Sequence, residues 1–226
     1  MRILTVADAE VPYLYEYYSP RRTEGVELII SCGDMHAKYL EFLTTVVNKP
    51  LLYVHGNHDT SYAGAPPEGC IPIEDTVYEF KGIRIAGLGG SYKYKKTGLP
   101  YMCTEQQMKR RVKKLSRIIR MYEGVDIIVA HAPCEGYGDR EDLPHWGFSV
   151  FNDLLNEFKP KYFLYGHVHK EYGDFEREIV HESGTTLINC YESYLLEFDE
   201  SAVRPHSEKA KKRIRLHEWW DHLGDR

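Results

Sequence analysis

Residues 51–59 read LLYVHGNHD, an apolar run that ends in a cluster of polar side chains. Four other stretches have the same form: residues 2–10 (RILTVADAE), 28–34 (LIISCGD), 127–133 (IIVAHAP) and 162–169 (YFLYGHVH). Short apolar runs rich in β-branched residues predict buried strands. The polar clusters therefore lie at the carboxyl ends of five predicted strands, the edge of an open α/β sheet where ligands and catalytic groups gather.

The first sixty residues predict a β-α-β-α-β order, with strands over 2–7, 26–32 and 51–55 and helices over 12–18 and 37–47. Such alternation favours parallel strand pairing. Further along, the pattern predicts a hairpin over 77–88, a helix from Thr104 as N-cap to about Tyr122, and a helix over 148–158. The last third is mostly strand-like, over 162–165, 175–180, 185–190 and 194–198. We predict an α/β fold of a single domain, 1–226, with an antiparallel second half and a C-terminal helix over 206–226.

Composition narrows the class of protein. A net charge of -5 over 226 residues argues against a general nucleic-acid-binding surface. The five cysteines are scattered, without a Cys-x-x-Cys motif, which is typical of a reducing compartment. The sequence shows neither a signal peptide nor an apolar run long enough for a membrane span, so we expect a cytoplasmic protein that does not associate with membranes. The oligomeric state stays open.

The residue types at the strand ends suit divalent cations. Asp8 and Glu10 are two residues apart, as are His167 and His169, so each pair can point into one site. The candidate metal ligands are Asp8, Glu10, Asp34, Asn57, His131, His167 and His169. Such oxygen and imidazole donors bind hard or borderline ions. Two ions about 3.5–4 Å apart activate water and stabilise a phosphoryl transition state. His58 and Asp59 can form an acid/base pair, with the carboxylate orienting the imidazole.

This ordered set resembles the calcineurin-like metallophosphoesterase family, whose pattern runs D-x-H, G-D, G-N-H-[D/E], H and G-H-x-H. The resemblance implies a four-layer αββα sandwich of two mixed β-sheets flanked by helices. It also implies a dinuclear centre, with one ion on Asp8, Asp34 and His169 and the other on Asp34, Asn57, His131 and His167. By the same resemblance, His58 protonates the leaving oxygen or holds the phosphate, and Asp59 orients His58. The implied activity is hydrolysis of a phosphodiester or phosphomonoester of a small molecule by a metal-bound hydroxide.

Glu10 departs from the family pattern, which has histidine at this position. Three outcomes are open: Glu10 ligates through a carboxylate oxygen, it hydrogen-bonds to a metal-bound water, or it turns away from the site. An oxygen-rich site favours Mn²⁺, Fe²⁺ or Mg²⁺ over Zn²⁺. We expect Mn²⁺, with the other three ions as alternatives.

A second polar cluster lies between residues 135 and 147 and resembles a loop-to-helix segment that borders the active site in small bacterial members of the family. We treat Asp142 and His145 as candidate substrate-binding residues, whereas His36 is expected to have only a local packing or surface role. The alternative to a hydrolase is an inactive scaffold that binds other proteins with the same fold. An acid/base histidine beside a complete second-metal set favours the hydrolase.

Overall fold

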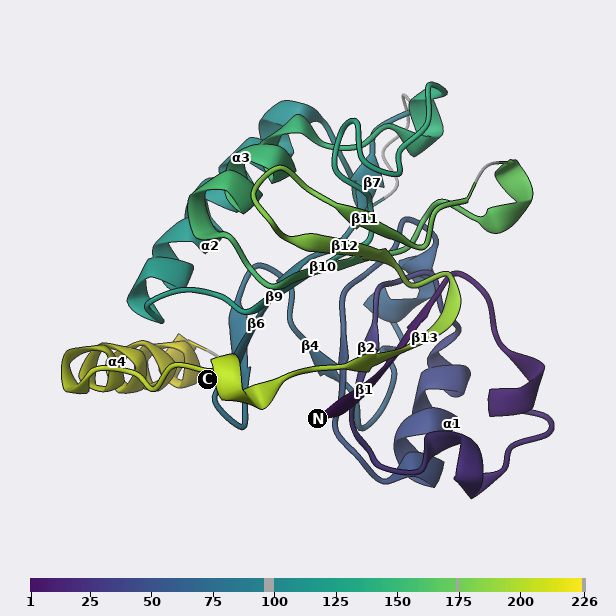
Figure 1. Ribbon diagram of the computed structural model, residues 1–226, viewed down its shortest axis with the longest axis horizontal. Coiled ribbons are helices and arrows are strands. Elements are labelled where there is room, and N and C mark those ends of the chain that lie inside the picture. Colours follow the sequence, from purple (N-terminus) through teal and green to yellow (C-terminus); the bar gives the residue numbers. More distant parts are fainter. Residues whose placement is uncertain (96–99, 174, 225–226) are drawn as a thin grey trace.

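Two mixed β-sheets lie face to face between helices in the computed structural model (Figure 1). The structure describes residues 1–95, 100–173 and 175–224, with only the backbone at 202 and 218–224. The first sheet has the order β13-β1-β2-β3-β4, from Glu192–Glu197, Arg2–Ala7, Val26–Ser31, Leu51–Tyr53 and Ile71–Pro72. The second has the order β11-β12-β10-β9-β6-β5, from Glu178–Val180, Thr186–Asn189, Tyr162–Tyr165, Ile127–Ala130, Ile83–Leu88 and Val77–Phe80. A two-stranded sheet pairs β7 (Ser91–Tyr92) with β8 (Met102–Cys103).

Three apolar interfaces hold these layers together. Because strand side chains alternate, Ile127 and Val129 of β9 face the core between the sheets, whereas Ile128 faces the outer helices. Helix α1 (Ala37–Val47) packs on the first sheet, while α2 (Glu105–Met121) and α3 (Ser149–Phe158) pack on the second (Figure 1). The predicted four-layer αββα sandwich is thus confirmed.

Local sequence signals explain where several elements begin and end. Thr104 is the N-cap of α2, as predicted, and the structure adds a capping box between Thr104 and Gln107. Helix α1 has the predicted bounds. In the predicted hairpin, Lys81 and Gly82 join β5 to β6 with φ angles of 50° and 83°. Both central residues of a type I′ turn need positive φ, which matches the twist of the strands.

Other expectations were wrong. The second half is only partly antiparallel. As predicted, β11 pairs antiparallel with β12, and β13 pairs antiparallel with β1. By contrast, β10 pairs in parallel with both β9 and β12, so the chain crosses over between these strands. The helix predicted over 12–18 is only a 3₁₀ turn at Pro12–Leu14. Further 3₁₀ turns in the described part of the chain span Pro20–Thr23, Asp59–Ala63, Leu143–His145, Lys170–Tyr172 and Glu200–Ala202. Prolines at 12 and 20 leave too short a segment for a stable helix. The C-terminal helix α4 spans Glu208–Gly224, and residues 225–226 lie outside the described part of the chain.

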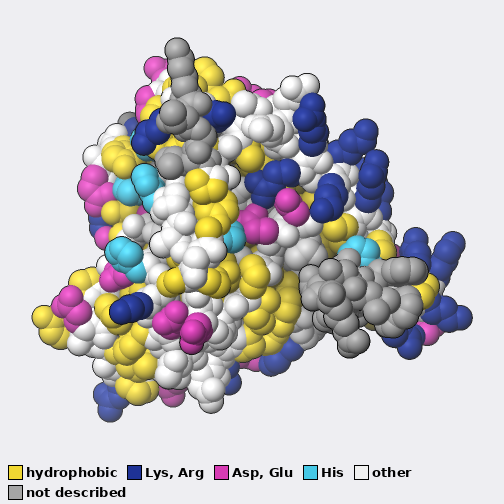
Figure 2. All heavy atoms as spheres, turned by 180° about the vertical axis from the view of Figure 1, so that it is seen from behind, with side chains coloured by type: hydrophobic (Ala, Val, Ile, Leu, Met, Phe, Trp, Pro, Cys, Tyr) yellow, Lys and Arg dark blue, Asp and Glu magenta, His cyan; other side chains and the backbone are white. Residues whose placement is uncertain are grey.

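Charge is unevenly distributed over the surface. Lys and Arg side chains gather on the side formed by α2 and α4 (Figure 2). The exposed basic residues of these helices are Lys109, Arg110, Lys113, Lys114, Arg117, Arg120, Lys209, Lys211, Lys212, Arg213 and Arg215. The protein therefore combines an acidic net charge with one basic side, formed by α2 and α4. Within the described residues, no helix combines the length and apolar content that a membrane crossing needs.

Candidate metal centre

Three candidate ligands stand in the left-handed backbone region within three residues of the ends of their strands. Asp8, Asp34 and His167 have φ angles of 64°, 57° and 69°. Such angles are uncommon for residues other than glycine and cluster at functional sites. The chain therefore turns sharply at each strand end, which aims these side chains across the edge of the sheets.

Two motif glycines make room for the carboxylates. A Cβ atom on Gly56 would lie 2.0 Å from Asp34 Oδ1, and one on Gly166 would lie 2.4 Å from Asp8 Oδ2. With glycine at these positions, both carboxylates can accept backbone hydrogen bonds. The His58 N–H donates to Asp34 Oδ1 at 2.7 Å, and the His167 N–H donates to Asp8 Oδ2 at 2.8 Å. Each carboxylate is thus anchored through one oxygen and keeps the other for the site.

Asp34, Asn57, His131 and His167 form one half of the site. His131 Nε2 lies 3.3 Å from Asp34 Oδ2 and 3.2 Å from Asn57 Oδ1. Potential ligand atoms of Asp34, His131 and His167 all lie within 4.8 Å of one another. The ring N–H of His131 at Nδ1 donates to the Cys32 carbonyl, and that of His167 at Nε2 donates to the Pro144 carbonyl, both at 2.8 Å. Such backbone bonds fix the ring orientation of metal-binding histidines.

Asp8 and His169 form the other half. Asp8 Oδ1 is buried and has no hydrogen-bond partner among the described residues, and it lies 3.4 Å from His169 Nε2. The His169 ring stacks between Tyr172 and Tyr191, with centroid distances of 4.8 and 4.7 Å. A buried carboxylate oxygen without a partner is costly unless a cation compensates it. This donor set therefore fits a divalent ion.

The electrostatics of the cluster also favour a cation. Burial raises the pKa of Asp34, but attraction to His131 and hydrogen bonds outweigh this effect and lower it to about 2. Burial lowers the pKa of His131, but Asp34 outweighs it and raises the value to about 10. Burial and the neighbouring His131 lower the pKa of His167 to about 3. A proton on His131 thus occupies the place that a metal ion would take, and metal binding competes with it.

The structure places Asp59 differently from the expected acid/base pair. Asp59 is 4% exposed, and its Oδ2 accepts hydrogen bonds from the backbone N–H groups of Gly56 and Asp34, at 2.7 and 2.9 Å. Among the described residues, no hydrogen bond joins Asp59 to the exposed His58 ring. Asp59 therefore ties together the two strand-end loops that carry Asp34 and Asn57.

A family model for calcineurin-like phosphoesterases matches residues 7–171, a range that contains every candidate residue above. The chain belongs to the calcineurin-like phosphoesterase family. This membership supports a phosphoesterase-type function.

Two curated relatives have low sequence identity to this chain. A UPF0046 protein of Caenorhabditis elegans is 25% identical over 172 residues, which cover 68% of this chain and 55% of that protein. A second one is 28% identical over 122 residues, 53% of this chain and 28% of that protein. The chain thus spans about half the length or less of these curated relatives.

Two solved structures share the fold. The protein TT1561 of Thermus thermophilus has a TM-score of 0.59 at 14% identity and covers 84% of this chain and 89% of that chain. Phosphopantetheinyl hydrolase of Mycobacterium tuberculosis has a TM-score of 0.57 at 14% identity and covers 90% of this chain and 98% of that chain. At this identity, the likeness concerns the fold alone.

In this phosphoesterase-family protein, a cavity of about 430 Å³ opens over the candidate ligands. Its lining includes His58 and His145, both predicted, and Tyr94, which belongs to the aromatic loop 92–96 that the sequence suggested could stack on a substrate base. It also includes His36, Pro144 and Tyr172, which sequence reasoning missed. Asp142 Oδ2 lies 2.6 Å from His145 Nδ1 and so orients the His145 ring. The centroid of this ring lies 5.2 Å from that of the His167 ring. The two residues are thus brought to the site together, His145 in the cavity and Asp142 behind it.

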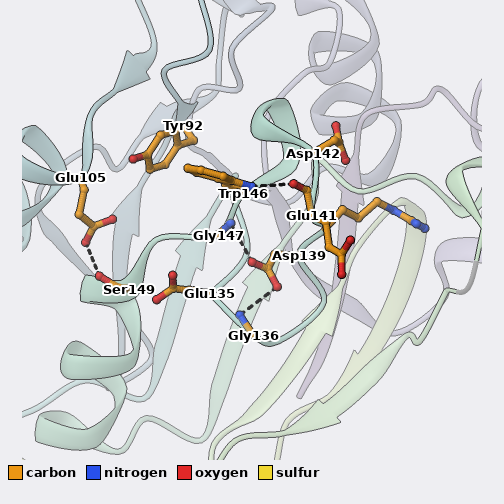
Figure 3. Close-up of a pocket in the computed structure, with 11 residues that line it drawn as sticks. Tyr92, Glu105, Glu135, Gly136, Asp139, Glu141, Asp142, Trp146, Gly147 and Ser149 are labelled. Atoms are coloured by element: carbon orange, nitrogen blue, oxygen red, sulfur yellow. Dashed lines mark hydrogen bonds between the residues drawn. The ribbon is translucent and has the colours of Figure 1, made fainter.

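A larger hollow of about 840 Å³ is lined by residues of the loop over 135–147, Asp142 among them (Figure 3). Its lining has five carboxylates and one guanidinium: Glu105, Glu135, Asp139, Glu141 and Asp142 outnumber Arg140, beside the aromatic rings of Tyr92 and Trp146. Asp139 accepts hydrogen bonds from the N–H groups of Gly136 and Gly147 and so shapes the loop. The lining of this hollow is therefore predominantly acidic.

Proposed function

We propose that this protein is a metal-dependent phosphoesterase with a dinuclear centre, and that Mn²⁺ is its preferred metal. The observation that carries the proposal is the convergence of six donor side chains from five strand ends. Asp34, Asn57, His131 and His167 would hold one ion, and Asp8, Asp34 and His169 the other. Divalent ions bound there would activate a water molecule and neutralise charge on the phosphoryl group.

The protein's own residues would orient and protonate the substrate. His58 is exposed in the cavity while its backbone N–H holds Asp34, so its ring is free to donate a proton to the leaving oxygen. His145, held by Asp142, would contact the substrate from the opposite loop. Asp59 would act as a positioning residue for Asp34 and Asn57.

The substrate class we propose is a small-molecule phosphodiester or phosphomonoester. The cavity over the ligands is of a size suited to a small ligand. Carboxylates line the larger hollow and would repel the phosphates of a longer polyanion such as nucleic acid.

The test is hydrolysis of p-nitrophenyl and alkyl phosphodiesters by metal-stripped protein after Mn²⁺ is added back. We expect Mn²⁺-dependent turnover that falls about 10²–10⁴-fold in His58→Ala. The fall should be larger for the alkyl ester, because a poor leaving group depends more on a proton donor. Thr45→Val, which changes an exposed residue of α1, is the control.

An inactive scaffold predicts a different result. If wild-type protein binds Mn²⁺ but turns over neither ester nor the corresponding monoesters, the hydrolase proposal fails. Equal loss with both esters would contradict the proton-donor role of His58 and leave the hydrolase intact.

A further inference from the structure

The side chain of His36 is joined to Glu10, the residue that replaces the first-motif histidine of the family. His36 stands at the N-cap position of α1, two residues after Asp34, but its side chain makes no capping hydrogen bond to the helix. Its Nδ1 lies 2.7 Å from Glu10 Oε1. Because a carboxylate only accepts hydrogen bonds, Nδ1 carries the proton and donates it. Among the described residues, Glu10 has no other hydrogen-bond partner.

Both side chains border the candidate centre. Together with Asp8, Asp34 and His58, they line a hollow of about 150 Å³. The His36 side chain is 87% exposed, whereas that of Glu10 is 32% exposed. Glu10 is thus the inner member of the pair and His36 the outer one.

We infer that His36 positions Glu10 as a ligand of the ion at the Asp8–His169 end, an inference that rests on the proposed function. A glutamate has more rotatable bonds than histidine and two equivalent oxygens, so it needs a partner that fixes its orientation. The N–H group of His36 occupies Oε1 and leaves Oε2 for a cation. Metal-binding carboxylates are generally held by such hydrogen bonds, and loss of the partner costs about 10–100-fold in metal affinity.

This arrangement gives the two ends of the centre different ligand chemistry. With Glu10, the Asp8–His169 end has three carboxylates, including Asp34, and one imidazole. The other end has Asp34, the Asn57 amide and two imidazoles. Carboxylates suit Mn²⁺ and Mg²⁺, whereas imidazole also suits Zn²⁺. The Glu10–His36 pair therefore shifts the selectivity of one end toward harder ions.

The experiment titrates metal-stripped protein with Mn²⁺ and counts the free ion by its EPR signal. His36→Phe keeps a ring but removes the donor, and we expect it to weaken one Mn²⁺ site about 10–100-fold and leave the other unchanged. His36→Asn places an N–H donor near the position of Nδ1 and should restore most of the loss. Glu10→Gln should weaken the same site. Thr45→Val, on the same helix, is the matched control.

A second measurement tests selectivity by competition between Mn²⁺ and Zn²⁺. Glu10→His restores the family pattern. It should shift the metal preference of the site at the Asp8–His169 end toward Zn²⁺. If His36→Phe leaves both Mn²⁺ affinities unchanged, or His36→Asn loses as much as His36→Phe, the positioning role is wrong. Wild-type protein that binds no Mn²⁺ would overturn the proposed function as well, so the wild-type titration tells the two failures apart.

Discussion

The buried carboxylate of Asp59 should cost stability at neutral pH in the metal-free protein. Burial and the negative charge of Asp34 raise its pKa from 3.8 to about 6. At about 1.4 kcal/mol per pKa unit, this rise corresponds to about 3 kcal/mol. The folded state binds this proton more tightly than the unfolded state does. The proton therefore adds to the free energy of unfolding in full below pH 3.8, and this stabilisation is lost as the pH rises through 6.

Asp59→Asn separates the charge of this residue from its hydrogen bonds. Asparagine keeps an oxygen that accepts from the Gly56 and Asp34 N–H groups but carries no charge. We expect it to raise the free energy of unfolding at pH 7.5 by about 1–3 kcal/mol, since the new amide N–H group offsets part of the gain. Asp59→Ala leaves both N–H groups without an acceptor, at about 1–3 kcal/mol each. It should therefore be about 2–6 kcal/mol less stable than Asp59→Asn.

Urea unfolding followed by circular dichroism, with a chelator present, measures these differences at pH 7.5 and 4.5. The gain of Asp59→Asn should shrink at the lower pH, where the wild-type carboxyl is protonated in the folded state. A gain that is absent at pH 7.5, or equal at both values, would refute the charge argument. Turnover adds a second readout: a loss in Asp59→Asn as large as that in His58→Ala would support the acid/base pair instead of the backbone role.

Four further outcomes follow from the structure. Asp126 pairs with Arg84 in the interior, with Oδ1 2.8 Å from Nη2, so Asp126→Ala should lower the free energy of unfolding by about 3–5 kcal/mol. Glu157→Ala, which breaks an exposed pair with Arg120, should cost about 0–1 kcal/mol in the same urea assay. His145→Ala should raise KM about 10–100-fold, the equivalent of a charged hydrogen bond, with unchanged Mn²⁺ stoichiometry by dialysis. Because the pKa of Asp34 is lowered to about 2, its contribution is present above pH 3.8 and lost as the pH falls toward 2. Acid unfolding of metal-free Asp34→Asn should lack this loss.

Much of the fold was predictable because its signals are local. The apolar runs of β1, β2, β9 and β10, the bounds of α1 and the cap of α2 depend on neighbouring residues in the chain. The direction of strand pairing in the second half was not predictable from the sequence, because parallel and antiparallel strands use the same buried, β-branched residues. The choice depends on where the chain crosses over, which no local pattern records.

The sequence by itself determined the family and which polar residues stand at the strand ends. Both can be recognised from short motifs of neighbouring residues. Only the tertiary structure decided which partners these side chains meet. Glu10 and His36 are 26 positions apart, and Asp59 reaches back 25 positions to the backbone of Asp34. Those contacts arise because parallel strands bring their carboxyl ends to one edge, so the distances depend on sheet register and loop path. The contacts of Glu10, His36 and Asp59 are therefore properties of the assembled edge.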